Sequence, residues 1–293
     1  MAQQSKNSPP RSAAEIEADL RAASSAADDA LDIASIALAF AEIDQPEKSR
    51  APYDAHLAEL INAGRLTLAK ADPARFKSAD KLAGAIAEII SGRFSYRGDT
   101  RTYDDLKNAD LMHVIDRRMG LPVALGILYL HIARALGLDM TGLNFPGHFL
   151  LRLQVGAEAA IIDPFNGGQI LSPADLLYLL RSIEGPDARL TPDLYAPVSA
   201  RDILLRLQNN ILSRALRGGD LEAARRVLTR MIWLAPDRSG LQFELGRLEV
   251  HAGHMGAAAT AFEHCRDMAA REGDMRIAQM AEEALRRLKS KLN

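Results

Sequence analysis

The sequence has 293 residues and a hydrophobic content of 48%, which is enough for a sizeable core. Its formal net charge is -2, unlike that of a strongly basic nucleic-acid-binding protein. Its single cysteine, Cys265, excludes an intrachain disulfide and gives no sign of an oxidising compartment. The N-terminus lacks the apolar stretch of a secretory signal. The longest apolar run, 121–138, contains charged and polar residues and is short for a membrane span. We therefore expect a cytoplasmic protein that binds neither nucleic acid nor membrane.

The N-terminal third is predicted to be helical. Residues 1–12 are polar, contain two consecutive prolines and are expected to form a disordered tail. Apolar residues then recur at helical spacing in 28–41, 53–71 and 78–91. These helices carry no chemical motif, so we interpret them as a helical lead-in.

The centre of the chain carries the candidate site. A short helix is expected over 106–119, and an apolar helix over 121–136 with Pro122 in its first turn. Two alternating segments follow, one with His148 and one ending at Asp163, and the residues VGAE between them predict a hairpin turn. A histidine on one strand and an aspartate on the next, packed on a helix, form an arrangement in which the carboxylate orients the imidazole as a base.

After a loop near 185–198, the chain is predicted to be helical again. Ala224 and Leu228 recur 34 residues later as Ala258 and Phe262, which is the period of tetratricopeptide repeats. Two repeats are too few for an independent solenoid, so they should pack on the core or on a partner.

Three central motifs together resemble one family. They are Arg117-Arg118-x-Gly120-x-Pro122, Pro146-Gly147-His148-Phe149 and Asp163-Pro164-Phe165-x-Gly167-Gly168. Motifs of this kind at this spacing are similar to the bacterial SirB-type family, a transglutaminase-like domain followed by tetratricopeptide repeats. The resemblance implies a Cys-His-Asp core with His148 as base and Asp163 as orienter. It also implies a link to the regulation of bacterial gene expression.

The nucleophile of that core is missing. The resemblance places Gly-x-Cys at the start of the central helix, where this chain has Gly120-Leu121-Pro122. Proline has no nucleophilic atom, and no cysteine occurs between Gly98 and Asp163. The His148–Asp163 pair is therefore either a hydrogen-bonded structural or binding pair, or serves another nucleophile or an activated water.

Several other residues are candidates for binding. Five lie in the three motifs: Arg117, Arg118, Phe149, Phe165 and Asn166. The alternative for the arginines is an ion pair within the domain, and for Asn166-Gly167-Gly168 a tight turn.

A metal site is not expected. The spacing of His251, His254, His264 and Cys265 matches no standard zinc arrangement, and Cys265 is better explained as a packed small hydrophobe. His131, inside the apolar helix, is expected to be a core histidine with its hydrogen bonds satisfied. No cofactor motif is present, so none is expected.

We therefore predict an α+β, mostly helical protein. A tail at 1–12 precedes a transglutaminase-like domain at 13–190, in which the helical lead-in joins a helix on a small antiparallel sheet, and TPR-like hairpins follow at 199–293. The preferred function is a non-catalytic protein-interaction or regulatory module that binds a protein or peptide through the repeats, the core cleft or both. The alternatives are a hydrolase or acyltransferase using His148 and Asp163, and a structural remnant with all binding on the repeats.

Overall fold

The computed structural model describes residues 9–70 and 78–292. The chain divides into two compact units, which we call the core unit (Met1–Ile16 and Ala27–Leu207) and the repeat unit (Glu17–Ala26 and Gln208–Asn293). No helix among the described residues is long and apolar enough to cross a membrane.

The predicted tail, 1–12, lies outside the described residues for its first eight positions. Beyond them, Arg11 pairs with the buried carboxylate of Glu42 at 2.6 Å. The last residue of this predicted segment, Ser12, also accepts a hydrogen bond from the backbone of Glu15 at 3.3 Å, beside the first turn of α1 (Ala13–Ser24). Ordered contacts therefore begin before residue 13.

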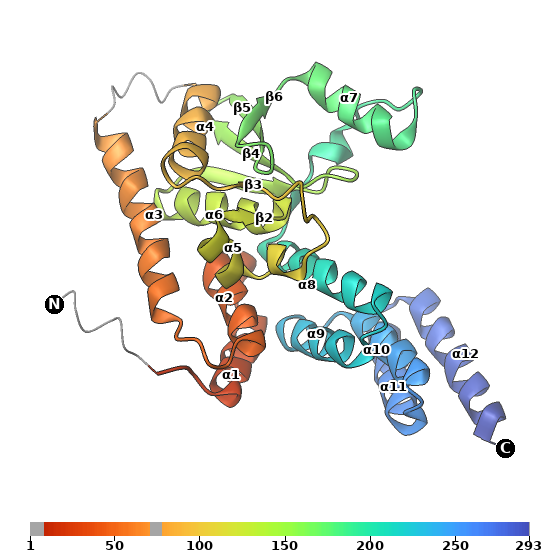
Figure 1. The fold of residues 1–293 in the computed structure, drawn as a ribbon. Helices are drawn as coiled ribbons and strands as arrows, with labels where there is room; N and C mark the ends of the chain where they lie inside the picture. Colours follow the sequence, from red (N-terminus) through yellow and green to blue (C-terminus); the bar gives the residue numbers. More distant parts are fainter. Residues whose placement is uncertain (1–8, 71–77, 293) are drawn as a thin grey trace. The chain divides into compact units, whose positions relative to one another are not determined.

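The lead-in of the core unit is helical, as predicted. It contains α2 (Ile33–Asp44), α3 (Ala51–Lys70) and α4 (Ala79–Ala87) (Figure 1). α2 begins later than predicted because Asp32 caps it, accepting from the Ser35 amide at 3.1 Å, and Asp28–Ala30 forms a separate 3-10 turn, η2. α4 continues into a π-helix, η4 (Glu88–Arg93), which helical periodicity does not distinguish from an α-helix.

The predicted helix over 106–119 is interrupted. It consists of a 3-10 turn, η5 (Leu106–Asn108), and the helix α5 (Leu111–Arg117), which Asp110 caps by accepting from the His113 amide at 2.9 Å. Arg118 ends α5 in a left-handed conformation with φ 56°. Two short strands, β1 (Arg97–Gly98) and β2 (Met119–Gly120), then pair in parallel just before the central helix.

A five-stranded antiparallel sheet has the order β6-β5-β4-β3-β7. Its strands are β3 (Asp139–Leu143), β4 (Leu150–Val155), β5 (Glu158–Asp163), β6 (Gln169–Leu171) and β7 (Pro197–Val198). The VGAE turn is confirmed: β4 ends at Val155, β5 begins at Glu158, and Gly156 has the positive φ of 58° that such a turn needs. The loop predicted at 185–198 is corrected at its end, because β7 pairs with β3.

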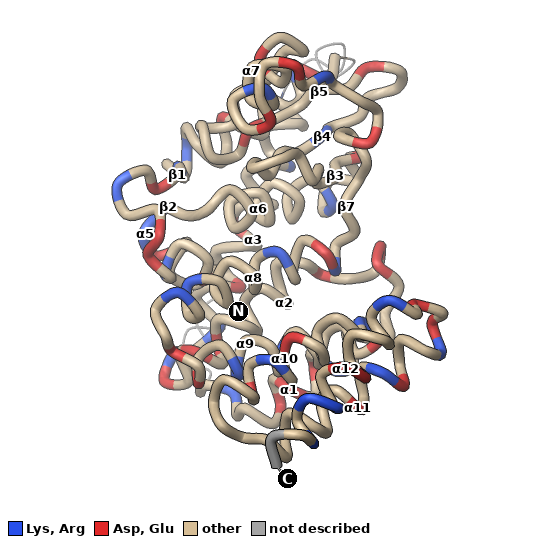
Figure 2. Tube along the Cα trace, turned by 90° about the vertical axis from the view of Figure 1, so that its right-hand side faces the viewer, with Lys and Arg blue, Asp and Glu red and all other residues tan. Residues whose placement is uncertain are grey.

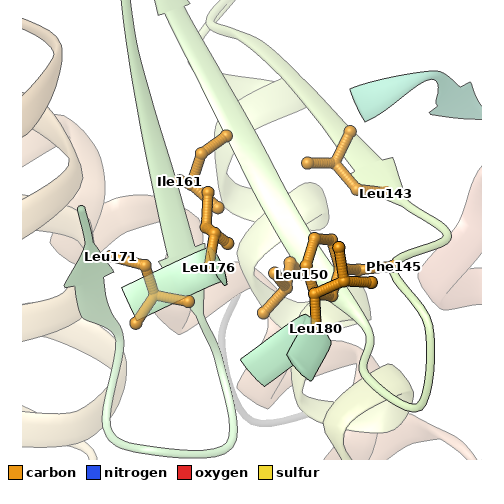
Figure 3. Packing of buried hydrophobic residues seen from close by; sticks show 7 residues of the cluster. All are labelled: Leu143, Phe145, Leu150, Ile161, Leu171, Leu176 and Leu180. Atoms are coloured by element: carbon orange, nitrogen blue, oxygen red, sulfur yellow. The ribbon is translucent and has the colours of Figure 1, made fainter. Parts of the chain in front are cut away.

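The sheet is covered on both faces. The central helix α6 (Pro122–Ala135) and α4 lie on one face, and α7 (Pro173–Glu184) lies on the other (Figure 1). Figure 2 shows α6 almost free of charge, since Arg134 is its only charged residue. The α7 face is an apolar cluster, shown in Figure 3: Leu143, Phe145, Leu150, Ile161, Leu171, Leu176 and Leu180. A mostly helical α+β fold is thus confirmed.

The repeat unit consists of helical hairpins. α8 (Ala200–Arg217) begins in the core unit and continues into the repeat unit, followed by α9 (Leu221–Leu234), α10 (Ser239–His251), α11 (Met255–Glu272) and α12 (Met275–Leu292). A Cβ on Gly246 would stand 2.6 Å from the Phe262 ring, so a small residue faces a large one where α10 and α11 pack, as the repeat pattern predicts. Cys265 is fully buried among these helices and burial raises the pKa of its thiol to about 11, so it is a packed hydrophobe, as predicted.

Candidate functional site

His148 ends a tight turn rather than standing on a strand. The sequence Phe145-Pro146-Gly147-His148 forms a turn in which the His148 amide donates to the Phe145 carbonyl at 3.0 Å. Pro146 has a fixed φ and Gly147 has a φ of 67°, the combination that a type II turn requires. β4 begins two residues later, at Leu150, so the predicted strand position of His148 is corrected. The turn leaves the His148 side chain half-buried.

Asp163 ends β5, as predicted, but its carboxylate is bound to the turn that follows it. Oδ1 accepts from the amides of Phe165 (2.9 Å) and Asn166 (3.2 Å), and Oδ2 accepts from the Asn166 side chain (2.7 Å). The Gly168 amide donates to the Asp163 carbonyl at 2.9 Å. Within the part of the chain that the structure describes, no hydrogen bond joins Asp163 to the His148 ring. Its role as an orienter stays a prediction.

A buried tyrosine lies behind this turn. Burial raises the pKa of the Tyr129 hydroxyl on α6 to about 12, and the nearby Asp163 charge acts in the same direction. The Tyr129 hydroxyl lies 3.2 Å from the Ser91 hydroxyl. A Cβ on Gly168 would stand 2.5 Å from that tyrosine oxygen and 2.5 Å from the Ala87 Cβ. Only a glycine therefore fits where the turn approaches α4 and α6.

The central helix begins without a reactive side chain. Leu121 is the residue before the helix, and its amide donates to the Asn108 carbonyl at 2.8 Å. Pro122 occupies the first helical turn, as predicted, and is partly exposed. The start of α6 thus offers backbone groups and a pyrrolidine ring, and no nucleophile.

Arg117 forms an ion pair within the core unit, which is the alternative that the sequence left open. Its guanidinium donates to the Asp99 carboxylate at 2.7 Å and to the Asn108 side chain at 3.0 Å. Burial alone would raise the pKa of Asp99, but hydrogen bonds from Thr102 and Arg117 hold it well below its usual range. The backbone of Asn108 holds Leu121, so this network fixes the entry to α6.

Arg118 belongs to a second polar cluster, which the sequence analysis missed. Its Nη1 donates to the Tyr96 hydroxyl at 2.6 Å, and the same Nη1 lies 2.5 Å from His56 Nε2. The Tyr96 hydroxyl is also 2.9 Å from His56 Nε2, and both side chains are buried. Burial lowers the pKa of His56, and the Arg118 charge lowers it further, so the imidazole is held neutral.

This cluster lies beside unusual backbone. Ser95 and Arg118 are the non-glycine residues with positive φ in the described ranges 9–70 and 78–292, and Ser95 lies two residues after the end of the π-helix. Such conformations persist where surrounding contacts hold them. The sequence signal for the cluster is weak, because His56, Tyr96 and Arg118 come from three separate segments.

The remaining candidate residues differ in their exposure. The Phe149 ring is buried and packs against Gly126 of α6, where a Cβ would stand 2.4 Å from it. Phe165 is half-buried and meets the exposed Tyr103 edge-to-face, with ring centroids 5.8 Å apart. Asn166 is exposed next to it. Phe165 and Asn166 are therefore accessible to a ligand, whereas Phe149 supports the site from beneath.

The histidines noted in the sequence have separate surroundings. His254 pairs with Glu249 at 2.7 Å, and His264 is exposed on α11. The described residues contain no group of three or more His, Cys, Asp or Glu side chains arranged to hold a metal ion. The expectation of a satisfied core histidine holds only in part for His131: its ring is hydrogen-bonded to the Leu57 backbone, but its buried Nε2 has no hydrogen-bond partner in the described structure.

Comparisons with known proteins agree with this architecture. Residues 52–209 match a model of the transglutaminase-like superfamily, and residues 211–286 match a tetratricopeptide repeat. A UPF0162 protein of Xylella fastidiosa is 29% identical over 234 residues, covering 79% of this chain and 82% of the relative. A UPF0162 protein of Vibrio cholerae is 31% identical over 212 residues, covering 71% and 76%.

More distant similarity extends beyond bacteria. F-box only protein 21 of Mus musculus is 31% identical over 180 residues, covering 58% of this chain and 28% of the relative. No solved structure gives a significant match. The family matches and the bacterial relatives follow the division seen in the fold, with a sheet-containing core before helical hairpins. The chain belongs to the transglutaminase-like superfamily and, with its repeats, to the SirB-type family of bacterial UPF0162 proteins.

Proposed function

We propose that this protein is a non-catalytic transglutaminase-like protein that acts as a protein-interaction or regulatory module in the cytoplasm. The observation that carries the proposal is the start of α6: Pro122 occupies its first turn, where the family resemblance would place the nucleophile, and a proline has no nucleophilic atom. The only cysteine is fully buried in the repeat unit, and its raised thiol pKa opposes formation of the reactive thiolate. The Asp163 carboxylate is already bound by its own turn.

The repeat unit supplies a surface that suits a partner. A groove of about 550 Å³ lies between α10, α11 and α12, and its apolar lining includes Phe243, Val250, Phe262, Met280 and Leu288. Arg247 and Arg287 also line it, in exposed ion pairs with Glu244 at 3.1 Å and with Glu283 at 3.8 Å. Tetratricopeptide repeats generally mediate protein–protein interaction. We infer that the groove takes a peptide segment of a protein partner, with apolar side chains inside and carboxylates beside the arginines.

The experiment tests the groove directly. Peptides with spaced apolar residues and flanking carboxylates are selected by display on the full chain, and their affinities are measured by fluorescence anisotropy. Met280→Glu places a charge in the groove and should weaken binding about tenfold or more. Met275→Glu is the matched control, because Met275 is exposed on the same helix outside the groove lining. Equal affinity of both variants would contradict the proposed surface.

A second surface in the core unit is part of the proposal. His148 is half-buried, Phe165 is half-buried and Asn166 is exposed, so this region can contact a ligand without covalent chemistry. If a partner binds here, His148→Ala and Asn166→Ala should weaken it, whereas Met280→Glu should not. The two sets of variants therefore separate the repeat surface from the core surface.

The alternative is a hydrolase or acyltransferase with His148 as base and Asp163 as orienter. The accessible imidazole favours it, with water or a non-cysteine nucleophile as the attacking group. An amide-hydrolysis and amine-transfer panel on wild type, His148→Ala and Cys265→Ser decides between the two. Turnover that survives Cys265→Ser and disappears in His148→Ala would overturn the non-catalytic proposal.

A further inference from the structure

The turn that carries His148 is held from outside by one side chain of α8. Arg206 Nη1 donates to the Asn144 side-chain oxygen at 2.5 Å, and Arg206 Nη2 donates to the His148 carbonyl at 2.9 Å. Asn144 precedes the turn and His148 ends it, so one guanidinium spans the turn. Arginine suits this position because its donors form a planar fork of fixed geometry.

The guanidinium is itself held in place by packing. Its Cζ lies 5.4 Å from the centroid of the Phe149 ring. That ring is only 2% exposed and is wedged against Gly126 of the central helix. The contacts therefore form a continuous series from α6 through Phe149 to Arg206 and the His148 backbone.

The surroundings of His148 make this contact specific. Its amide is bound within the turn, to the Phe145 carbonyl, and its carbonyl is bound to Arg206. Within residues 9–70 and 78–292, Arg206 is the only side chain that is hydrogen-bonded to His148. Both backbone groups of the residue are thus fixed, while its half-buried imidazole makes no hydrogen bond in the same described ranges.

We propose that Arg206 is a positioning residue: it fixes the direction in which His148 presents its imidazole and makes that direction depend on α8. The inference rests on the proposed role of the core surface in binding. α8 is the helix that begins in the core unit and continues into the repeat unit. The family match ends at residue 209, so Arg206 lies inside the transglutaminase-like region. The position of the imidazole is consequently set by a helix that follows the sheet in sequence.

The test compares three variants of the full chain. Arg206→Ala removes the fork, Arg206→Lys keeps a charge without the fork, and Arg226→Ala removes an exposed arginine of α9 as the control. Hydrogen exchange is measured at the amides of residues 145 and 147–150 and of α6, and the His148 imidazole is followed by NMR. Because a hydrogen bond from a charged donor is lost, Arg206→Ala should speed exchange at His148 and Phe149 about tenfold or more. The imidazole signal should broaden or shift.

The conservative variant and chemical rescue separate positioning from general stability. Arg206→Lys should also alter the imidazole signal, since lysine is a single point charge. Methylguanidinium at low millimolar concentration should restore the signal in Arg206→Ala, with Arg226→Ala unaffected throughout. An unchanged imidazole signal in Arg206→Ala would overturn the proposal. Faster exchange in α6 of Arg206→Ala would mean that this variant is destabilised in general. In that case Arg206→Lys decides, and a wild-type His148 signal in Arg206→Lys would overturn the proposal.

These readouts do not involve a partner. If no selected ligand loses affinity in His148→Ala while the imidazole is disturbed in Arg206→Ala, the positioning role is supported and binding at the core surface is contradicted. If a ligand loses affinity in His148→Ala while the imidazole is undisturbed in Arg206→Ala, the core surface is supported and the positioning role is overturned. The two proposals therefore fail separately.

Discussion

The turns at His148 and at Asp163 occupy neighbouring ends of β4 and β5, yet they are built in opposite ways. The His148 turn is fixed through its backbone: Gly147 supplies the positive φ, and hydrogen bonds hold the His148 amide and carbonyl. The Asp163 turn is fixed through a side chain, whose two oxygens accept three hydrogen bonds from the residues that follow. The first turn leaves the His148 imidazole without a hydrogen bond in the described part of the chain, whereas the second turn uses the Asp163 carboxylate to hold its own backbone.

The same contrast extends to the approach to the central helix. Arg117 is bound to Asp99 and Asn108, and Arg118 is bound beside Tyr96 and His56. The two arginines were candidates for contact with a ligand, but in the structure they form bonds within the core unit. They lie around the start of α6, where no side chain is a nucleophile. Internal bonds thus fix the shape of this region, whereas His148 and Phe165 stay half-exposed and Asn166 is exposed.

The largest effect should come from filling the space behind the Asp163 turn. Gly168→Ala would place a Cβ 2.5 Å from both the Tyr129 hydroxyl and the Ala87 Cβ, at a φ of 79°. We expect a loss of about 4 kcal/mol in the free energy of unfolding, measured with urea. Gly167→Ala, at a φ of 69° with open space around it, should cost only about 1 kcal/mol. Equal losses would show that the close approach to Tyr129 is not a constraint.

Removing the Asp163 side chain should have the next largest effect. Asp163→Ala leaves the part-buried Phe165 and Asn166 amides without their acceptor and should lower the free energy of unfolding by about 3 kcal/mol. Asp163→Asn keeps one carbonyl oxygen for the backbone amides but sets its NH2 against the Asn166 side chain, so a loss of about 1 to 2 kcal/mol is expected. If the catalytic orienter role dominates instead, Asp163→Asn should be as stable as wild type and should abolish any turnover.

Local signals in the sequence predicted much of this region. Pro122 indicates the start of α6, and Gly156 within VGAE indicates the hairpin, because each residue acts on the backbone within a few positions of itself. Likewise, Ala258 and Phe262 predicted the helical hairpins through their spacing.

What the sequence did not predict depends on contacts between distant segments. β7 exists because Val198 reaches Gly142 of β3, and the π-helix at Glu88–Arg93 has the periodicity of an ordinary helix end. The candidate site shows the same limit. The spacing of His148 and Asp163 placed them at the sheet, but only the fold reveals that Asp163 is bound to Asn166 and that Arg206 holds the His148 turn.

The pH dependence of stability should report on the cluster beside Arg118. Burial and Arg118 lower the pKa of His56 in the folded state, whereas the unfolded chain titrates near the ordinary histidine value of about 6.5. Above that pH, His56 is neutral in both the folded and the unfolded state, and the free energy of unfolding has its full value. As the pH falls below it, the unfolded state binds the proton first, so the free energy of unfolding decreases until the lowered folded pKa is passed.

Urea unfolding at a series of pH values between 7.5 and 5 measures this decrease, whose slope for one histidine is at most about 1.4 kcal/mol per pH unit. His56→Gln should flatten the curve, because glutamine keeps an acceptor for Arg118 and Tyr96 but does not titrate. The exposed His264→Gln is the control and should leave the curve unchanged. A residual slope in His56→Gln is expected from His131, whose pKa is also lowered by burial. A curve unaltered by His56→Gln would mean that the cluster does not require a neutral imidazole.

The smallest effect on stability should come from His148 itself. Its ring is half-buried and makes no hydrogen bond or ion pair in the described part of the chain, so His148→Ala should change the free energy of unfolding by less than about 0.5 kcal/mol. Phe149→Ala, next to it, removes a ring that is 2% exposed and should cost about 3 to 5 kcal/mol. A cost above about 1.5 kcal/mol for His148→Ala would show that the imidazole is structural, like the Asp163 carboxylate. A near-zero cost combined with weakened ligand binding would be the strongest support for the contrast. A turn held by three hydrogen bonds would then present a side chain that the fold does not need.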